Sequence, residues 1–141
     1  MAHTHSSVVP LLAYEQGTAA MDWLIAVFGF VERARMLDAA GRLSHGELLA
    51  GESVIMLAAP TPDYQSPKTV AEHYEPARQW RDLPWIFNGV LVYVENVDAH
   101  FQRAKAHGAR ILSEIEDGPP GRRYRAEDFE GQRWFFIQRT A

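Results

Sequence analysis

The chain carries an internal repeat, and this repeat limits the possible folds more than any other feature of the sequence. Tyr14 recurs as Tyr93, and Gly29 as Gly108, each 79 positions later. The segment GRLSHGELLAGES then recurs as GRRYRAEDFEGQR at a spacing of 80, which aligns Glu47 with Glu127. Self-similarity at a fixed spacing indicates a duplicated structural unit. Because the chain has 141 residues, we expect one domain, residues 1–141, built from two such units.

Both halves show the same order of hydrophobic patterns. In residues 8–60 an apolar strand-like run precedes a helix that we expect to start after Thr18 as its N-cap and to stop at Gly29. The period then changes to two, which predicts strands at about 31–37, 42–49 and 53–58. Residues 88–140 repeat this order, with Asp98 as the expected N-cap and strands at 110–115, 122–128 and 133–139. The sequence therefore predicts an α+β fold with two βαβββ repeats.

The segment that joins the halves, residues 61–87, has a different composition. It holds four of the eight prolines and several aromatic residues, including Tyr64, Trp80 and Trp85. We expect a connecting loop here, and two interpretations stay open. Its rings are either buried on the body of the domain, or they form a lid over a pocket.

Composition excludes several classes of protein. The net charge is −4, and the basic residues are scattered, so a nucleic-acid partner is not expected. No apolar run reaches the length of a membrane span, and we expect no membrane association. The chain has no cysteine, which excludes thiolate metal sites and agrees with a cytoplasmic location.

Two segments extend the repeat pattern into a family resemblance. With AMDWLIAVFGF in the first helix and AEDFEGQRWFFIQ at the end of the second unit, the chain resembles the vicinal oxygen chelate superfamily. This superfamily includes glyoxalase I, fosfomycin and bleomycin resistance proteins, and extradiol dioxygenases. The resemblance implies a curved mixed sheet around a cup, with helices outside and a ligand inside. One scaffold hosts several chemistries in this superfamily, so fold alone does not decide function.

The resemblance also implies where metal-using members hold a divalent ion. The corresponding positions of this chain are Val9 or Pro10, Met56, Val90 and Phe135, and their neighbours are equally apolar. Divalent ions of this kind need nitrogen or carboxylate ligands. We therefore expect no metal at the family site and no cofactor.

The expected ligand-binding residues are mostly apolar or aromatic, and the ligand is expected to be a hydrophobic or aromatic small molecule. This set comprises Leu12, Tyr14, His45, Met56, Trp85, Val92, Arg133 and Phe135. His45 and Glu47 alternate along one strand, so they are candidate acid and base groups, although a solvent-exposed polar face is the commoner explanation of such a pair. We expect Glu127 to support a turn, and His100 and His107 to face solvent. The Arg122–Arg125 cluster is expected to form cross-strand ion pairs, with an anion site for a carboxylate or phosphate as the alternative.

Three functions remain open at this point. The leading hypothesis is a metal-free, glyoxalase-like small-molecule-binding protein, expected to be a homodimer, which could sequester a compound as bleomycin resistance proteins do. The alternative is a lyase, isomerase or dioxygenase-type enzyme that uses His45 and Glu47 as acid and base, or as ligands of a shifted metal site. The third is an interaction domain without a small ligand.

Overall fold

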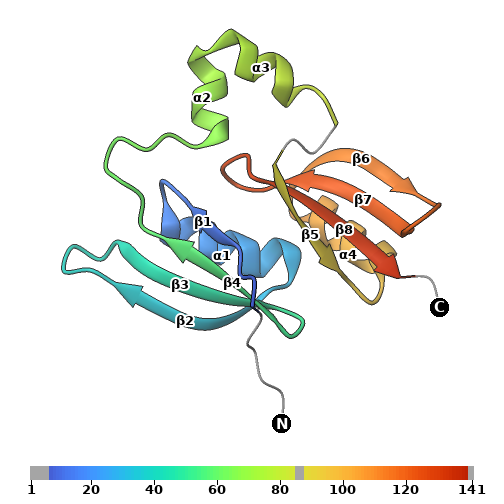
Figure 1. Ribbon diagram of the computed structural model, residues 1–141, viewed down its shortest axis with the longest axis horizontal. Helices are drawn as coiled ribbons and strands as arrows, with labels where there is room; N and C mark the ends of the chain where they lie inside the picture. The colour runs from blue at the N-terminus through green and yellow to red at the C-terminus, as the bar shows by residue number, and fades with distance from the viewer. Residues whose placement is uncertain (1–6, 85–87, 140–141) are drawn as a thin grey trace. The chain divides into compact units, whose positions relative to one another are not determined.

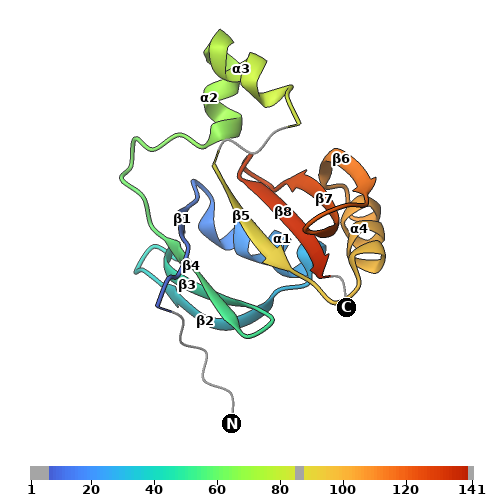
Figure 2. The same ribbon diagram turned by 45° about the vertical axis from the view of Figure 1, so that its right-hand side comes forward.

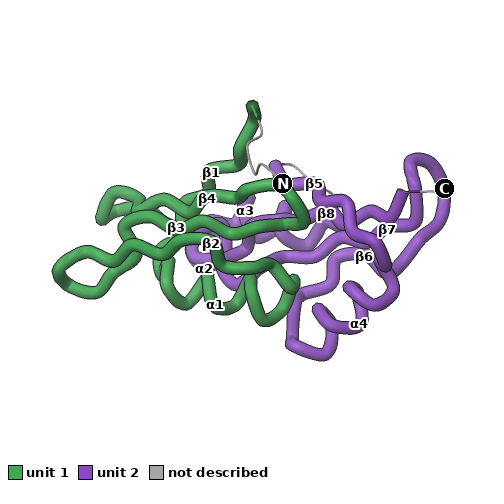
Figure 3. Tube along the Cα trace, turned by 90° about the horizontal axis from the view of Figure 1, so that it is seen from below, with its two compact units in different colours: residues 1–64 green, residues 65–141 purple. Residues whose placement is uncertain are grey.

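The chain folds into two compact units, residues 1–64 and residues 65–141. The computed structural model describes residues 7–84 and 88–139. Figure 1 labels the elements in chain order, and Figure 3 colours the two units separately. Trp85, expected at the ligand, lies outside the described residues. Within the described ranges, no helix is both long and apolar enough to cross a membrane.

The first unit contains one mixed four-stranded sheet and one helix. Along the chain come β1 (Leu11–Ala13), α1 (Gly17–Phe28), β2 (Val31–Leu37), β3 (Leu43–Ala50) and β4 (Ser53–Ala58). The strand order is β1-β4-β3-β2. β1 runs parallel to β4, whereas β3 is antiparallel to both of its neighbours. β1 and β4 can be parallel because α1 and the β2–β3 hairpin lie between them in the chain. Parallel neighbouring strands need a long crossover connection of this kind.

α1 covers one face of this sheet (Figure 3). Its apolar stripe buries Ala20, Met21, Leu24, Val27 and Phe28. Gly29 ends the helix with a φ of 75° and donates its N–H to the carbonyl of Ile25. Only glycine adopts such a conformation without strain, so the expected stop is correct. The start differs from expectation, because the helix begins at Gly17 and Thr18 is already inside it.

The second unit repeats this arrangement. It contains β5 (Gly89–Tyr93), α4 (Val97–Ala106), β6 (Arg110–Glu116), β7 (Gly121–Glu127) and β8 (Arg133–Arg139), in the strand order β5-β8-β7-β6. β5 is parallel to β8. α4 lies against β6, β7 and β8 (Figures 1 and 2). The expected N-cap Asp98 is wrong, because Asn96 accepts the N–H of Ala99 at 3.0 Å and Asp98 lies in the first turn.

The α+β fold with two βαβββ units is therefore confirmed, and β2, β4 and β8 have the expected bounds. The connecting segment is different from the expected loop. It contains two helices, α2 (Pro67–His73) and α3 (Glu75–Arg81). Ser66 caps α2 by accepting the N–H of Thr69 at 3.2 Å, and Pro67 occupies the first helical turn, where its missing N–H costs nothing.

Candidate functional sites on the two sheets

His45 and Glu47 lie on the face of the first sheet that is opposite to α1, which we call the first open face. Between them, Gly46 points toward α1, and a Cβ on Gly46 would come within 3.0 Å of the Met21 sulfur. Nε2 of His45 donates a hydrogen bond to Oε2 of Glu47 across 2.8 Å. Glu47 also pairs with Arg33 at 3.3 Å. His45, Glu47 and Arg33 thus form a partly buried chain of an imidazole, a carboxylate and a guanidinium.

Apolar side chains surround this polar chain. Met56 lies opposite Glu47, and Ala58 lies opposite His45. Leu11 of β1 is paired with Met56, so it shares the same face. Leu12, expected at the ligand, is instead paired with Leu57 and lies on the side of α1. The structure therefore brings Met56 and His45 together and separates Leu12 from them.

Tyr14 belongs to a different place in the first unit. Its side chain is buried and lines a cavity of about 670 Å³ beside the start of α1 and the turn between β2 and β3. This cavity also borders Asp38, Leu43 and Tyr64. Tyr14 is thus not brought together with His45, although sequence reasoning grouped the two.

The second sheet has an equivalent open face, opposite to α4, that bears Phe135. Phe135 is half-buried and is paired with Leu91 on one side and Arg125 on the other. The guanidinium of Arg125 lies 4.7 Å from the centre of the Phe135 ring. Along the same face, the Arg139 guanidinium lies 3.9 Å from the centre of the Tyr93 ring. Leu91 and Tyr93 are 45% and 46% exposed, so this face presents large apolar groups to solvent.

Val92 lies on the other side of this sheet. It is paired with Phe136, whose ring centre is 4.1 Å from that of His100 in α4. The expectation that Val92 contacts a ligand beside Phe135 therefore does not match its position. The reading of His100 as solvent-facing is also wrong, since its Nδ1 lies 2.6 Å from the hydroxyl of buried Tyr124. His107 matches expectation, because it is exposed at the end of α4.

The arginines of β7 form ion pairs on both faces, as expected. Arg122 binds Asp98 and Asp117 on the side of α4. Arg123 and Arg125 pair with a single carboxylate, Glu116, at 3.7 and 3.1 Å. On the second open face, Arg123 and Arg125 thus share one acid, Glu116.

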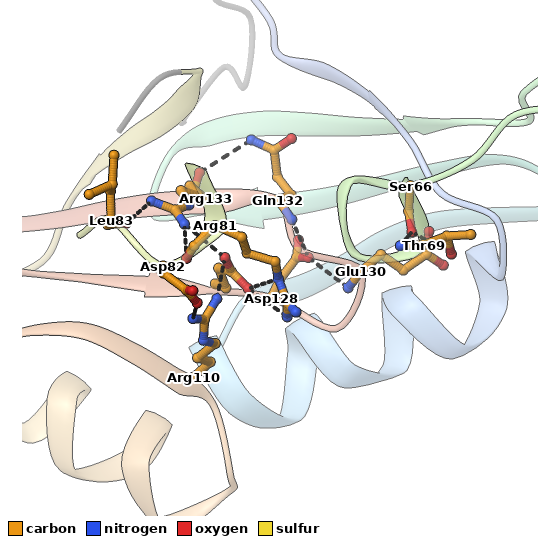
Figure 4. Close-up of polar contacts among 11 residues, drawn as sticks. Ser66, Thr69, Arg81, Asp82, Leu83, Arg110, Asp128, Glu130, Gln132 and Arg133 are labelled. Carbon is orange, nitrogen blue, oxygen red and sulfur yellow. Dashed lines mark hydrogen bonds and ion pairs between the residues drawn. The ribbon is translucent and has the colours of Figure 1, made fainter. Parts of the chain in front are cut away.

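Arg133 is held inside the second unit rather than presented to a ligand. It is 6% exposed and donates to Glu127 at 3.1 Å and to the carbonyl of Arg81 at 2.7 Å. Arg81 and Arg110 bind the same carboxylate (Figure 4). Burial lowers the pKa of Arg133, and the charge of Glu127 opposes this effect. These contacts join the end of α3 to β6, β7 and β8.

The sequence suggested that Glu127 supports the turn between β7 and β8, but Glu127 instead binds the arginines. The neighbouring Asp128 supports this turn, because its carboxylate accepts the backbone N–H groups of Glu130 and Gln132. It also accepts the indole N–H of Trp134 at 2.9 Å. Asp128 therefore fixes the buried turn, and Glu127 holds the charge cluster.

Strand pairing shows which residues lie opposite the acidic and basic side chains of each unit. Glu47 lies opposite Met56, which is itself paired with β1. In the second unit, the residue opposite the β5-paired Phe135 is Arg125, whereas Glu127 lies opposite Arg133. The turn between β7 and β8 is longer than the turn between β3 and β4, so one constant spacing cannot align both strands of the two hairpins.

The family metal site does not fit the residues at its positions. Met56 and Phe135 occupy the open faces, and neither offers a nitrogen or carboxylate ligand. In the portion of the chain that the structure describes, no group of three or more His, Asp or Glu side chains is placed to hold an ion.

Comparisons with known proteins agree with this fold. A family model for the glyoxalase/bleomycin resistance protein/dioxygenase superfamily matches residues 6–136. The crystal structure of TioX from Micromonospora sp. ML1 is similar, with a TM-score of 0.70, 33% identity, and coverage of 96% of this chain and 98% of that one. The uncharacterized protein Mb0911c of Mycobacterium bovis is 28% identical over 82% of this chain and 70% of its own length.

A more distant structural neighbour was solved with a ligand. It is a bleomycin-binding protein from bleomycin-producing Streptomyces verticillus, complexed with copper(II)-bleomycin. Its TM-score is 0.61 at 14% identity, and the match covers 96% of this chain and 98% of that one. At this identity the likeness is one of fold.

Proposed function

Because this chain belongs to the glyoxalase/bleomycin resistance protein/dioxygenase superfamily, we propose that it binds a hydrophobic or aromatic small molecule without a protein-bound metal. The observation that carries this proposal is the second open face. There, exposed Leu91 and Tyr93 flank the half-buried ring of Phe135. Exposed apolar groups gathered on one face are typical of a binding surface. Sequestration of a toxic compound is the role that fits such a site.

The test is a binding titration after metal removal. The protein is dialysed against EDTA and titrated by calorimetry with metal-free bleomycin, copper(II)-bleomycin and a panel of aromatic antibiotics. We expect at least one compound to bind with a dissociation constant in the micromolar range or below. Absence of binding across the panel, or binding that disappears with the chelator, contradicts the proposal and favours the enzyme or the interaction domain.

A matched pair of leucine variants assigns the site. Leu91→Ala removes an exposed side chain on the second open face, and Leu83→Ala removes one of similar exposure (41%) next to α3. Burial of a leucine against a ligand is worth roughly 1.5 to 3 kcal/mol, so Leu91→Ala should weaken binding about tenfold or more. Leu83→Ala should leave it unchanged. Equal effects of both variants would remove the second open face from the proposal.

A homodimer and a cytoplasmic location are further parts of this proposal. The homodimer is supported by the exposed apolar side chains of both sheets, such as Val31 and Leu91. Sedimentation equilibrium over a hundredfold concentration range tests it. A mass of 16.0 kDa at every concentration would contradict a dimer.

An enzymatic function is the second candidate, and the His45–Glu47 hydrogen bond of 2.8 Å supports it. A carboxylate that is bound to an imidazole on a partly apolar face can move a proton to or from carbon, as lyases and isomerases require. In D₂O, such a base would exchange the α-hydrogen of a bound carbonyl compound for deuterium. We expect exchange, if present, to be lost in Glu47→Gln and kept in Glu52→Gln, a matched change in the exposed turn between β3 and β4.

Metal analysis of untagged protein separates this candidate from the shifted metal site. Stoichiometric metal that disappears in His45→Ala would place an ion at His45 and Glu47. Activity that persists in metal-free protein would instead assign acid–base chemistry to the pair.

A further inference from the structure

We propose that the ligand of the second open face is an acidic aromatic compound, with Arg125 binding its carboxylate and Tyr93 and Phe135 contacting its rings. This inference rests on the proposed function and specifies the chemical class that the site takes. It adds an acidic group to the hydrophobic or aromatic ligand that the sequence suggested.

The charge of the second open face is the first reason. Arg123 and Arg125 have side chains only 18% and 16% exposed, and both pair with Glu116. One carboxylate balances one of these two charges, so the pair retains a net positive charge. Because both guanidinium groups are partly desolvated, they attract an anion more strongly than surface lysines or arginines would.

The contact between arginine and aromatic rings is the second reason. Arg125 lies over Phe135 at 4.7 Å, and Arg139 lies over Tyr93 at 3.9 Å. A guanidinium over a ring keeps its N–H donors in the plane of the group, where they bind a carboxylate in the two-point geometry that arginine favours. A flat acid would thus find donors for its carboxylate beside rings and a leucine for its apolar part.

The charge of the first open face is the third reason. There the residue opposite Met56 is the acid Glu47, whereas on the second open face the residue opposite Phe135 is the cation Arg125. Because Arg33 pairs with Glu47, one cation balances one acid on the first open face, and no net positive charge remains there to attract an anion. The preference for an acid is therefore a property of the second sheet and not of the repeated fold.

The experiment uses three ligands that share one ring system: 2-naphthoate, 2-naphthamide and 2-naphthylmethylammonium. Each is titrated by calorimetry into the full chain, at low salt and at about 0.3 M salt. We expect 2-naphthoate to bind at least tenfold more tightly than the amide, and the ammonium compound to bind most weakly. The advantage of the acid should shrink at higher salt, because added ions screen its attraction to the arginines.

Two glutamine variants of β7 arginines on opposite faces of the strand test the assigned residue. Arg125→Gln should abolish the preference for the acid over the amide. Arg122→Gln removes the same charge on the other face of the same strand, where Arg122 binds Asp98, and should keep the preference. Arg125→Lys is added because it keeps the charge but not the two-point geometry, and it should retain only part of the preference. Circular dichroism and melting temperature confirm that each variant is folded.

Several outcomes would overturn the inference. These are equal affinity for acid and amide, equal loss in Arg122→Gln and Arg125→Gln, or no binding of 2-naphthoate up to millimolar concentration. If one of these is found while an antibiotic binds in the titration described above, the proposed function stands and only the acidic class is wrong. If neither titration shows binding, both proposals fail.

Discussion

Arg133 donates a hydrogen bond to Glu127 across 3.1 Å although both side chains are almost completely buried. Arg81 and Arg110 approach the same carboxylate at 3.0 and 2.9 Å. Three guanidinium groups thus depend on one acid. A buried acid in this position holds together the strands and the α3 end that carry the cations.

Replacement of Glu127 by glutamine should be strongly destabilising. The amide keeps the volume but removes the negative charge, so Arg133 remains buried beside two other cations. Loss of one partner of a buried ion pair typically costs about 3 to 5 kcal/mol. We expect the free energy of unfolding, measured in urea, to fall by about this amount.

The matched control for this change is Glu75→Gln. Glu75 pairs with Arg78 at 2.6 Å on the exposed surface of α3, and such pairs contribute about 0.2 to 1 kcal/mol. If the two variants are destabilised equally, Glu127 is not the centre of the cluster.

The sequence was sufficient to predict the repeated units. Both halves show the same order of strand-like and helix-like hydrophobic periodicities, even where few residues are identical. Strands such as Val31–Leu37 show clear boundary signals, with glycines and polar turns at their ends. The residues opposite Glu47 and Glu127 were not predicted, because register depends on turn length and on which strands pair. The hydrogen bonds between strands determine the register, and the hydrophobic periodicity of the sequence does not reveal it.

The two helices of the connecting segment were missed for a different reason. Four prolines suggested a loop, yet Pro67 and Pro76 lie in the first turns of α2 and α3, where proline is favourable. The signal was present as Ser66 followed by Pro67, a capping residue before a first-turn proline. The charge cluster of Glu127 could not be foreseen, because Arg81 lies 46 residues away in the chain.

Gly131 should tolerate alanine less well than its repeat partner Gly51. Both have positive φ, 92° and 62°, so alanine costs about 1 to 2 kcal/mol at either position. At Gly131 the new Cβ would also lie 2.8 Å from the backbone nitrogen of Lys68, whereas nothing lies within 4 Å at Gly51. We expect Gly131→Ala to cost about 2 to 4 kcal/mol in urea unfolding. Equal losses would show that the turn does not contact α2.

Asp98 should contribute to stability only above acidic pH. The hydrogen bond from Arg122, together with the charge of that guanidinium, holds the pKa of Asp98 below its ordinary value of 3.8. A lowered folded pKa gives stability that is present above the unfolded pKa and is lost as pH falls through the folded value. Arg122→Gln should therefore reduce stability at pH 7 but make the acid-induced loss shallower between about pH 4 and pH 2. Unchanged acid dependence would contradict the assigned pair.

For Tyr124 we expect the opposite pH dependence, a loss of stability at alkaline pH. Its side chain is fully buried, and burial raises the pKa of its phenol above the ordinary 10.0 because the phenolate would lose its hydration. A raised folded pKa gives stability that is complete below the unfolded value and is lost as pH rises toward the folded one. In Tyr124→Phe this alkaline loss should be smaller above about pH 10, although the variant lacks the hydrogen bond to His100 and should be roughly 1 kcal/mol less stable at pH 7. The measurement is the urea midpoint from pH 7 to pH 11. Tyr74→Phe removes an exposed phenol hydroxyl and is the control variant, so equal profiles for the two variants would contradict the burial effect.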